Sequence, residues 1–282
     1  MTQNSVLSTH ARKPLTVFVE GIGLLGPGLS NWAQGGGCLD NSVPYKDVRC
    51  ILPSPMALPS AERRRAGAVV KVSLAVAQEA VAASGLRADA LPSVFSSSNG
   101  DAMNCHEICS ALASNDRLIS PTRFHNSVHN AASGYWSISS GAMASSSVLC
   151  ARDASFAAGL LEAMTQVVVE GTPVLLVAYD TDYPEPMHSV RPVQDSFGVG
   201  LVLAPQRSEH SQACWVLDPA SCFTDTAADL LDDVALEQLR NNIPAARCLP
   251  LLQSVAIHSS GEVVLAYLQG AQLAVRVAPC LR

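Results

Sequence analysis

The stretch Phe124–Ala163 reads FHNSVHNAASGYWSISSGAMASSSVLCARDASFAAGLLEA, and it decides the fold that we expect. A short apolar segment, Ser147–Ala151, runs into a tight Cys-Ala-Arg-Asp turn, and a helix rich in small residues follows from Ala154. A strand that turns sharply into a buried helix is where many α/β proteins hold a nucleophile. The stretch therefore predicts an α/β protein and raises the question of which residue occupies the turn.

Composition and charge narrow the class of protein. The chain has 282 residues, of which 48% are hydrophobic, 15% charged and 5% aromatic, as in tightly packed α/β layers. The low charge content indicates that a partner covers part of the apolar surface. A net charge of −6 gives no electrostatic case for binding nucleic acid. The polar N-terminus and the short apolar runs predict neither a signal peptide nor a membrane span.

The cysteines and glycines give no support for a metal or a cofactor. Nine scattered cysteines, mostly in apolar surroundings, are typical of reduced, buried thiols in a cytoplasmic protein. Cys105 and Cys109 flank a histidine, but no second ligand pair at zinc spacing accompanies them. Gly21–Gly26 matches G-x-G-x-x-G, yet Pro27 and Gly28 follow at once and prevent the helix that a dinucleotide site needs. We therefore expect a glycine-rich turn there, no metal and no cofactor.

Hydrophobic patterns predict the other elements. One helix is expected from Ser60, its N-cap, to Ser84, with Gly85 as its stop. Its first turn carries Arg63, Arg64 and Arg65, which form either a solvated face or a contact for an acidic carrier protein. Further expectations are strands over 15–20, 93–101, 173–179 and 197–204, helices over 102–115 and 227–241, and two strands within 262–278 that join at Gln269 and Gly270.

With these segments in order, residues 14–205 resemble the N-terminal half of a β-ketoacyl synthase, on the thiolase fold. Four stretches carry the resemblance, namely VFVEGIGLLGP from Val17, SSSNGD from Ser96, NAASGYWSI from Asn130 and GVGLVL from Gly198. FHNSVHNAASGYWSI together with ARDASFAAGLLEA is similar to the short chain-length factors of aryl polyene biosynthesis. The resemblance implies layered α/β/α packing over 14–205, with 206–282 as a divergent C-terminal extension.

The chain departs from that family at the catalytic residues. The family places a cysteine at the strand-to-helix elbow and two histidines in its C-terminal half, whereas only His210 and His258 follow residue 205 here. Aligning the helix after the elbow puts Asp153 at the nucleophile position; a different gap puts Cys150 there instead. Asp153 is also a good helix N-cap, and Cys150, in an apolar strand, is expected to be a small buried residue.

Residues around the elbow are candidates for lining a tunnel or meeting a partner. His125 and His129 are four apart, which suits one helical face, and Asn126 and Asn130 accompany them. Three interpretations remain open: a hydrogen-bonded polar segment beside a dimer interface, ordinary histidines with satisfied hydrogen bonds, and a metal or catalytic pair. Phe156 is expected in the buried stripe of the helix. The full candidate set is Phe124, His125, Asn126, His129, Asn130, Trp136 and Phe156.

Three functions follow as expectations. The first is a non-catalytic partner of a full-length ketosynthase, which forms a heterodimer and helps set the length of an acyl chain held on an acyl carrier protein. The second is an active short synthase or acyltransferase that uses Cys150. The third is a module that binds acyl chains or the carrier protein through Arg63, Arg64 and Arg65.

Overall fold

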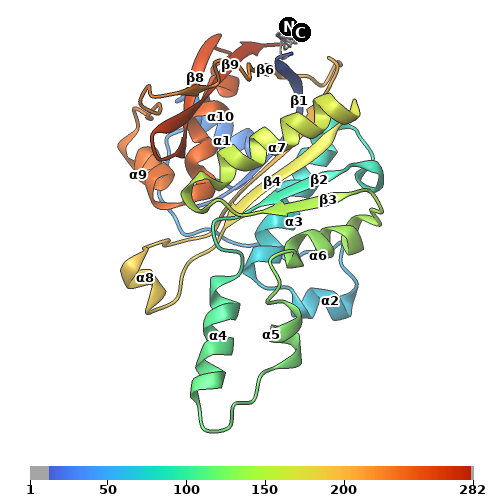
Figure 1. The fold of residues 1–282 in the computed structure, drawn as a ribbon, viewed down its shortest axis with the longest axis vertical. Coiled ribbons are helices and arrows are strands. Elements are labelled where there is room, and N and C mark those ends of the chain that lie inside the picture. The colour runs from blue at the N-terminus through green and yellow to red at the C-terminus, as the bar shows by residue number, and fades with distance from the viewer. Residues whose placement is uncertain (1–12, 281–282) are drawn as a thin grey trace, which may run out of the picture.

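A computed structural model describes residues 13–280, and its centre is one nine-stranded mixed sheet (Figure 1). The strands are β1 (Leu15–Leu25), β2 (Ser93–Ser96), β3 (Ser146–Leu149), β4 (Val174–Asp180), β5 (Phe197–Ala204), β6 (Ala213–Leu217), β7 (Phe223–Thr224), β8 (Gly261–Leu268) and β9 (Ala271–Pro279). Their order across the sheet is β3-β2-β4-β5-β1-β6-β9-β7, and β8 pairs with β9 off this path. β2 is parallel to β3 and β4, and the other described pairs are antiparallel.

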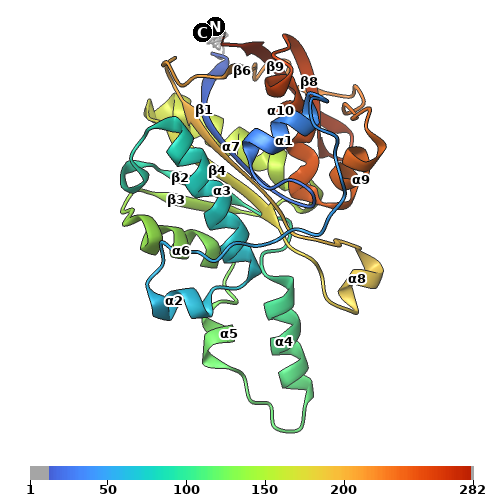
Figure 2. The same cartoon turned by 180° about the vertical axis from the view of Figure 1, so that it is seen from behind.

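Helices cover both faces of this sheet. They are α1 (Trp32–Leu39), α2 (Ser60–Arg65), α3 (Ala68–Ser84), α4 (Ala102–Ala113), α5 (Pro121–His125), α6 (Ala131–Ser140), α7 (Ser155–Glu170), α8 (Met187–Val190), α9 (Val234–Asn242) and α10 (Leu249–Ala256), with 3-10 turns η1 (Ala88–Ala90), η2 (Arg152–Ala154) and η3 (Pro244–Cys248). One core cluster joins α7, η3 and α10 to the sheet, and a second joins α3 and α6 to its other face (Figure 2). The layered α/β/α packing is confirmed.

Glycines inside β1 and β5 let α3 lie directly on the sheet. Ideal Cβ atoms on Gly23 and Gly200 would lie 2.1 Å and 2.3 Å from the same carbonyl oxygen, that of Val76. The close approach expected for the strand at 197–204 is therefore present. The glycine-rich turn expected at Gly21–Gly26 is wrong for Gly21 and Gly23, because these residues continue β1 and meet the backbone of α3.

The single helix expected from Ser60 to Ser84 is two helices. α2 has no buried residue, whereas α3 buries Val70, Leu74, Ala77 and Val81, so only α3 has an apolar stripe to pack. The chain becomes extended at Ala66 and Gly67 between them. The three arginines consequently lie in the last turn of α2 rather than in the first turn of a long helix, and that is the favourable end for cations. Gly85 ends α3 in the left-handed conformation, as expected.

The segment after residue 205 is more ordered than its polar sequence suggests. β6 pairs with both β1 and β9, so the sheet continues from the N-terminal strands into the segment after residue 205. The strand pair predicted within 262–278 is confirmed as β8 and β9. The helix expected over 227–241 is shorter, because Asp233 caps α9 by accepting from the N–H groups of Ala235 and Leu236. η3 and α10, which carry several fully buried apolar residues, were not expected. The division into domains at residue 205 stays a prediction.

α4 and α5 form an arm that projects from the body of the molecule in both views (Figures 1 and 2). Asp101 caps α4 by accepting from the N–H of Asn104, and Ser120 caps α5 by accepting from Arg123. In residues 13–280 no helix combines the length and the apolar character needed to cross a membrane.

Candidate functional site

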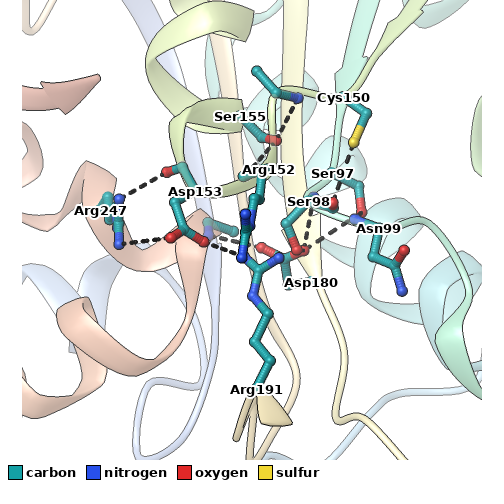
Figure 3. A network of polar contacts seen from close by, with 12 residues as sticks. Ser97, Ser98, Asn99, Cys150, Arg152, Asp153, Ser155, Asp180, Arg191 and Arg247 are labelled. Atoms are coloured by element: carbon teal, nitrogen blue, oxygen red, sulfur yellow. Dashed lines mark hydrogen bonds and ion pairs between the residues drawn. The ribbon is translucent and has the colours of Figure 1, made fainter. Parts of the chain in front are cut away.

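The candidate site lies where three parallel strands end. β3, β2 and β4 are neighbours and run in the same direction, so their carboxyl ends meet at one edge of the sheet. The loops that follow them bring together residues 97–99, residues 150–153 and Asp180 (Figure 3). The strand-to-helix elbow expected from the sequence is part of this cluster.

The elbow is a strained turn held by a serine. Arg152 has a φ of 52°, a left-handed conformation that is uncommon for a residue with a side chain. Ser155, the first residue of α7, accepts a hydrogen bond of 3.0 Å from the Ala151 N–H and donates one of 2.7 Å to the Arg152 carbonyl oxygen. Residues held in such conformations cluster at functional sites. The strain at Arg152 therefore marks the elbow as a constrained part of the fold.

Cys150 lies just outside β3 and is exposed. The expectation that it is a small buried residue is wrong, because the strand ends at Leu149 and β3 is the edge strand of the sheet. Its sulfur donates a hydrogen bond of 3.1 Å to the Ser98 carbonyl oxygen. A carbonyl oxygen cannot take a proton from the sulfur as a histidine would. Within residues 13–280, no hydrogen bond joins a histidine to Cys150.

Asp153 is held by two arginines instead of capping α7. Its carboxylate forms an ion pair with Arg191 and lies 3.6 Å from the Arg247 guanidinium, while Arg247 also donates to the Asp153 carbonyl oxygen at 3.1 Å (Figure 3). The expected N-cap is wrong, because η2 moves the start of α7 to Ser155 and the cap position, Ala154, has no side-chain bond. Burial lowers the pKa of Arg247, and the carboxylate of Asp153 opposes that shift.

A fully buried carboxyl group lies beside the elbow. Asp180 accepts hydrogen bonds from the Ser98 N–H at 2.9 Å, the Ser98 hydroxyl at 2.6 Å and the Ala245 N–H at 2.8 Å. Ser98 Oγ also lies 2.9 Å from the hydroxyl oxygen of Tyr183. Burial raises the pKa of Asp180 to about 6, and the three hydrogen bonds limit the rise. This carboxyl therefore titrates close to neutral pH.

The histidine segment is a surface turn and not one helical face. α5 ends at His125, and His129 lies in the turn before α6, which begins at Ala131 immediately after Asn130. Both histidines are exposed, although the His129 ring packs over Gly100 and this partial burial lowers its pKa. No group of three or more potential metal ligands occurs among the described residues.

Asn126 is the buried member of that segment and ties three helices together. Its side chain donates to the Arg65 carbonyl oxygen at 3.0 Å and accepts from the Tyr135 hydroxyl at 3.2 Å. Trp136 and Phe156 are also buried, and Phe156 belongs to the expected core stripe of α7. Phe124 is 67% exposed on the arm. The seven candidates therefore do not line one cavity together.

The arginines of α2 lie away from the elbow. Arg64 and Arg65 are exposed, and Arg65 pairs with Glu62 at 3.0 Å. Arg64 and Arg65 line a hollow of about 440 Å³, together with Arg123 of α5.

Sequence reasoning missed Asp180, Ser98, Arg191 and Arg247 as members of the cluster. A signal existed for the first two. Asp180 ends β4, Ser98 comes two residues after the end of β2, and these two strands are parallel neighbours. The two arginines carried no such signal, since Arg191 lies in an irregular loop and Arg247 in an unexpected 3-10 turn.

Known structures share this fold over nearly the whole chain. The ketosynthase ApeO in complex with its chain length factor ApeC, from Xenorhabdus doucetiae, contains a chain of 20% identity and TM-score 0.69, with 93% of this chain and 99% of that chain covered. The ishigamide ketosynthase/chain length factor has a sequence identity of 13% and a TM-score of 0.68, with 94% of this chain and 99% of that chain covered. The AntDE:AntF complex of a type II polyketide synthase has an identity of 12% and a TM-score of 0.71, with 93% of this chain and 99% of that chain covered. These similarities establish a thiolase-like fold.

Comparison of the sequence itself gives the family. No curated protein sequence matches the chain significantly. The model of the β-ketoacyl synthase N-terminal domain matches residues 33–249, which is most of the chain and includes the elbow, β4, β5 and α9. The chain therefore belongs to the β-ketoacyl synthase family.

Proposed function

We propose that this chain is the non-catalytic partner of a full-length ketosynthase, with which it forms a heterodimer as a chain-length factor. The observation that carries the proposal is the state of Asp153, whose carboxylate is held between Arg191 and Arg247. A condensing enzyme needs a thiolate that carries the acyl chain and a base that activates it. A carboxylate fixed by two guanidinium groups supplies neither.

The fold supports the same proposal. The chain aligns over 99% of a chain in each of two ketosynthase–chain length factor structures. We infer a role in aryl polyene or related polyketide-type biosynthesis, in the cytoplasm, on chains held by an acyl carrier protein. Phe124, His125 and His129 lie on the exposed face of this region and are our candidates for meeting the ketosynthase. Trp136 and Phe156 are buried on opposite faces of the sheet, and each would act by supporting the face on which it packs.

Co-expression with the ketosynthase encoded beside this chain tests the proposal. We expect a stable heterodimer, and elongation of carrier-bound chains that depends on both subunits. Asp153→Ala should retain this activity, because the Asp153 carboxylate takes no part in the chemical reaction. A monomeric chain that leaves elongation by the ketosynthase unchanged contradicts the proposal.

The second candidate function is an active short synthase or acyltransferase, and the exposure of Cys150 favours it. The thiol lies at the elbow and is accessible to an acyl thioester. Incubation with acyl carrier thioester and intact-mass measurement test this function. An adduct that Cys150→Ser removes, and that Cys109→Ser, at another exposed thiol, does not remove, would establish it. We expect no adduct.

The carrier protein would meet the arginines of α2. We propose Arg63, Arg64 and Arg65 as this contact, because they gather on a short helix with an exposed face. Reversal of the three charges should weaken carrier binding, whereas reversal of Arg87, which is 81% exposed on another segment, should not. Unchanged binding after the triple reversal would remove α2 from the contact.

A further inference from the structure

An extended segment between α1 and α2, residues 40–57, forms a strap across the end of β1. The Gly28 N–H donates to the Val48 carbonyl oxygen at 2.7 Å, and the Tyr45 hydroxyl donates to the Pro27 carbonyl oxygen at 3.0 Å. Gly28 has a φ of +66°, and a Cβ there would lie 2.0 Å from the Lys46 carbonyl oxygen. The turn after β1 is therefore shaped to hold the strap close.

A cavity of about 580 Å³ lies between the strap and the turn that leads into α1. This volume is within the range of small-molecule sites, roughly 300–1,000 Å³. Its lining is mainly apolar and includes Leu25, Leu29, Val48 and Ile51. Val48 and Ile51 are 57% and 83% exposed. A hollow lined by apolar side chains, two of which are exposed to solvent, points to a ligand with an apolar body.

Both charged residues that line the cavity are basic. The chain has a net charge of −6, yet the charged residues that line this cavity are Lys46 and Arg49. Arg49 is paired with Asp182 at 3.0 Å. Lys46 is exposed, and within residues 13–280 no ion pair is found for it. Lys46 is therefore the cation available to an anionic group in the cavity.

The extended backbone of the strap separates the charges. Side chains alternate along an extended chain, and Lys46 and Val48 line the cavity, whereas Tyr45 and Asp47 line a neighbouring hollow with Asp195. Arg49, which is paired with Asp182, borders both hollows. The acidic side chain next to Lys46 is thus directed to the other side of the strap. The cavity combines an apolar wall with one unpaired positive charge.

We propose that this cavity binds a medium-chain fatty carboxylate, with the hydrocarbon chain against the apolar wall and the carboxylate on Lys46. The site lies at the strap and not at the elbow, and its ligand is a free acid. The inference goes beyond the proposed function and does not depend on the ketosynthase partner.

Calorimetric titration of the full-length chain with dodecanoate, below the concentration at which it forms micelles, tests the site. We expect saturable binding of one molecule. Decanoate should bind about tenfold more weakly, because each methylene buried is worth about 0.8 kcal/mol and each 1.4 kcal/mol is a factor of ten. Dodecanol, which lacks the charge, should also bind at least about tenfold more weakly.

Two variants with matched controls locate the binding. Lys46→Glu should lower dodecanoate affinity at least about tenfold and leave dodecanol unchanged, whereas Lys13→Glu, at another exposed lysine, should have no effect. Val48→Asp should weaken both ligands, and Val169→Asp, at an exposed valine on α7, should weaken neither. Urea unfolding of each variant shows whether it remains folded.

Several results would overturn the proposal. Absence of saturable dodecanoate binding, or equal affinity for the acid and the alcohol, removes the anionic ligand. Loss of ketosynthase binding by Val48→Asp in a chain that binds no dodecanoate makes the cavity part of a protein interface instead. Failure of the heterodimer alone would count against the proposed function and leave this site standing.

Discussion

The carboxylate of Asp180 accepts a hydrogen bond of 2.8 Å from the backbone N–H of Ala245. Asp180 ends β4, in the middle of the sheet, and Ala245 belongs to η3, which packs with α7 and α10. The same carboxylate accepts two bonds from Ser98, at the end of the neighbouring strand β2. One buried acid therefore links the parallel strands to the segment after residue 205.

Asp180→Ala should destabilise the whole chain by about 3 kcal/mol, because it leaves the N–H groups of Ser98 and Ala245 buried without an acceptor and removes one partner of the Ser98 hydroxyl. Urea unfolding followed by tryptophan fluorescence measures this loss, since Trp32 and Trp136 precede residue 205 and Trp215 lies in β6 after it. We expect a single transition. Asp182→Ala, in an ion pair with the exposed Arg49, is the control and should change little. Separate melting of the β6–β9 segment would contradict the linkage.

The free energy of unfolding should depend on pH through the ionisation of Asp180. Its folded-state pKa of about 6 lies above the unfolded value of about 3.9, so the folded protein binds this proton more tightly. Its contribution is full below about pH 4 and is lost as the pH rises to about 6.

The difference in unfolding free energy between the wild type and Asp180→Asn isolates this contribution, because other titrating groups cancel. We expect the difference to fall by about 2–3 kcal/mol from pH 4 to pH 7. Urea midpoints measured at half-unit steps give the curve. A flat difference would show that the group ionises at its ordinary pKa, and a difference that rises with pH would show that folding lowers the pKa of Asp180.

The elements with a strong local pattern were predictable from the sequence. The apolar runs at 173–179 and 197–204 predict β4 and β5, and the small-residue stretch after the elbow predicts α7; the structure contains all three. β6 was missed because it is a short strand in a polar region, and its alternating burial depends on pairing with β1 and β9. The local sequence predicts Asp153 as a helix cap, because its actual partners, Arg191 and Arg247, come from distant segments. Long-range ion pairs leave no local signal.

The glycines in β1 and β5 allow α3 to pack directly on the sheet, and the sequence pattern does not predict this close contact. Gly23→Ala should destabilise the fold by about 3 kcal/mol or more, because the new Cβ would lie 2.1 Å from the Val76 carbonyl oxygen and α3 would have to move. Gly134→Ala is the matched control, since Gly134 lies in α6 and no atom lies within 4 Å of a Cβ there. That change should stabilise the protein by about 0.5–1 kcal/mol. Thermal unfolding of the two variants distinguishes close packing from the general cost of a glycine.

The ion pairs at the elbow lead to the last prediction. Asp153→Ala removes the partner of Arg191 and Arg247, each with a side chain only 21% exposed. A half-buried guanidinium without its counter-charge is costly. Because Asp153 itself is 46% exposed, solvent screens part of the effect, and we expect a loss of about 1–2 kcal/mol in urea unfolding.

Asp89→Ala breaks the exposed pair with Arg87 and serves as the control, with no measurable change expected. If the ion pairs hold the turn, Asp153→Asn should recover part of the loss, because an amide oxygen still accepts from one guanidinium. Equal stability of the wild type and Asp153→Ala would mean that the two arginines contribute nothing to the elbow.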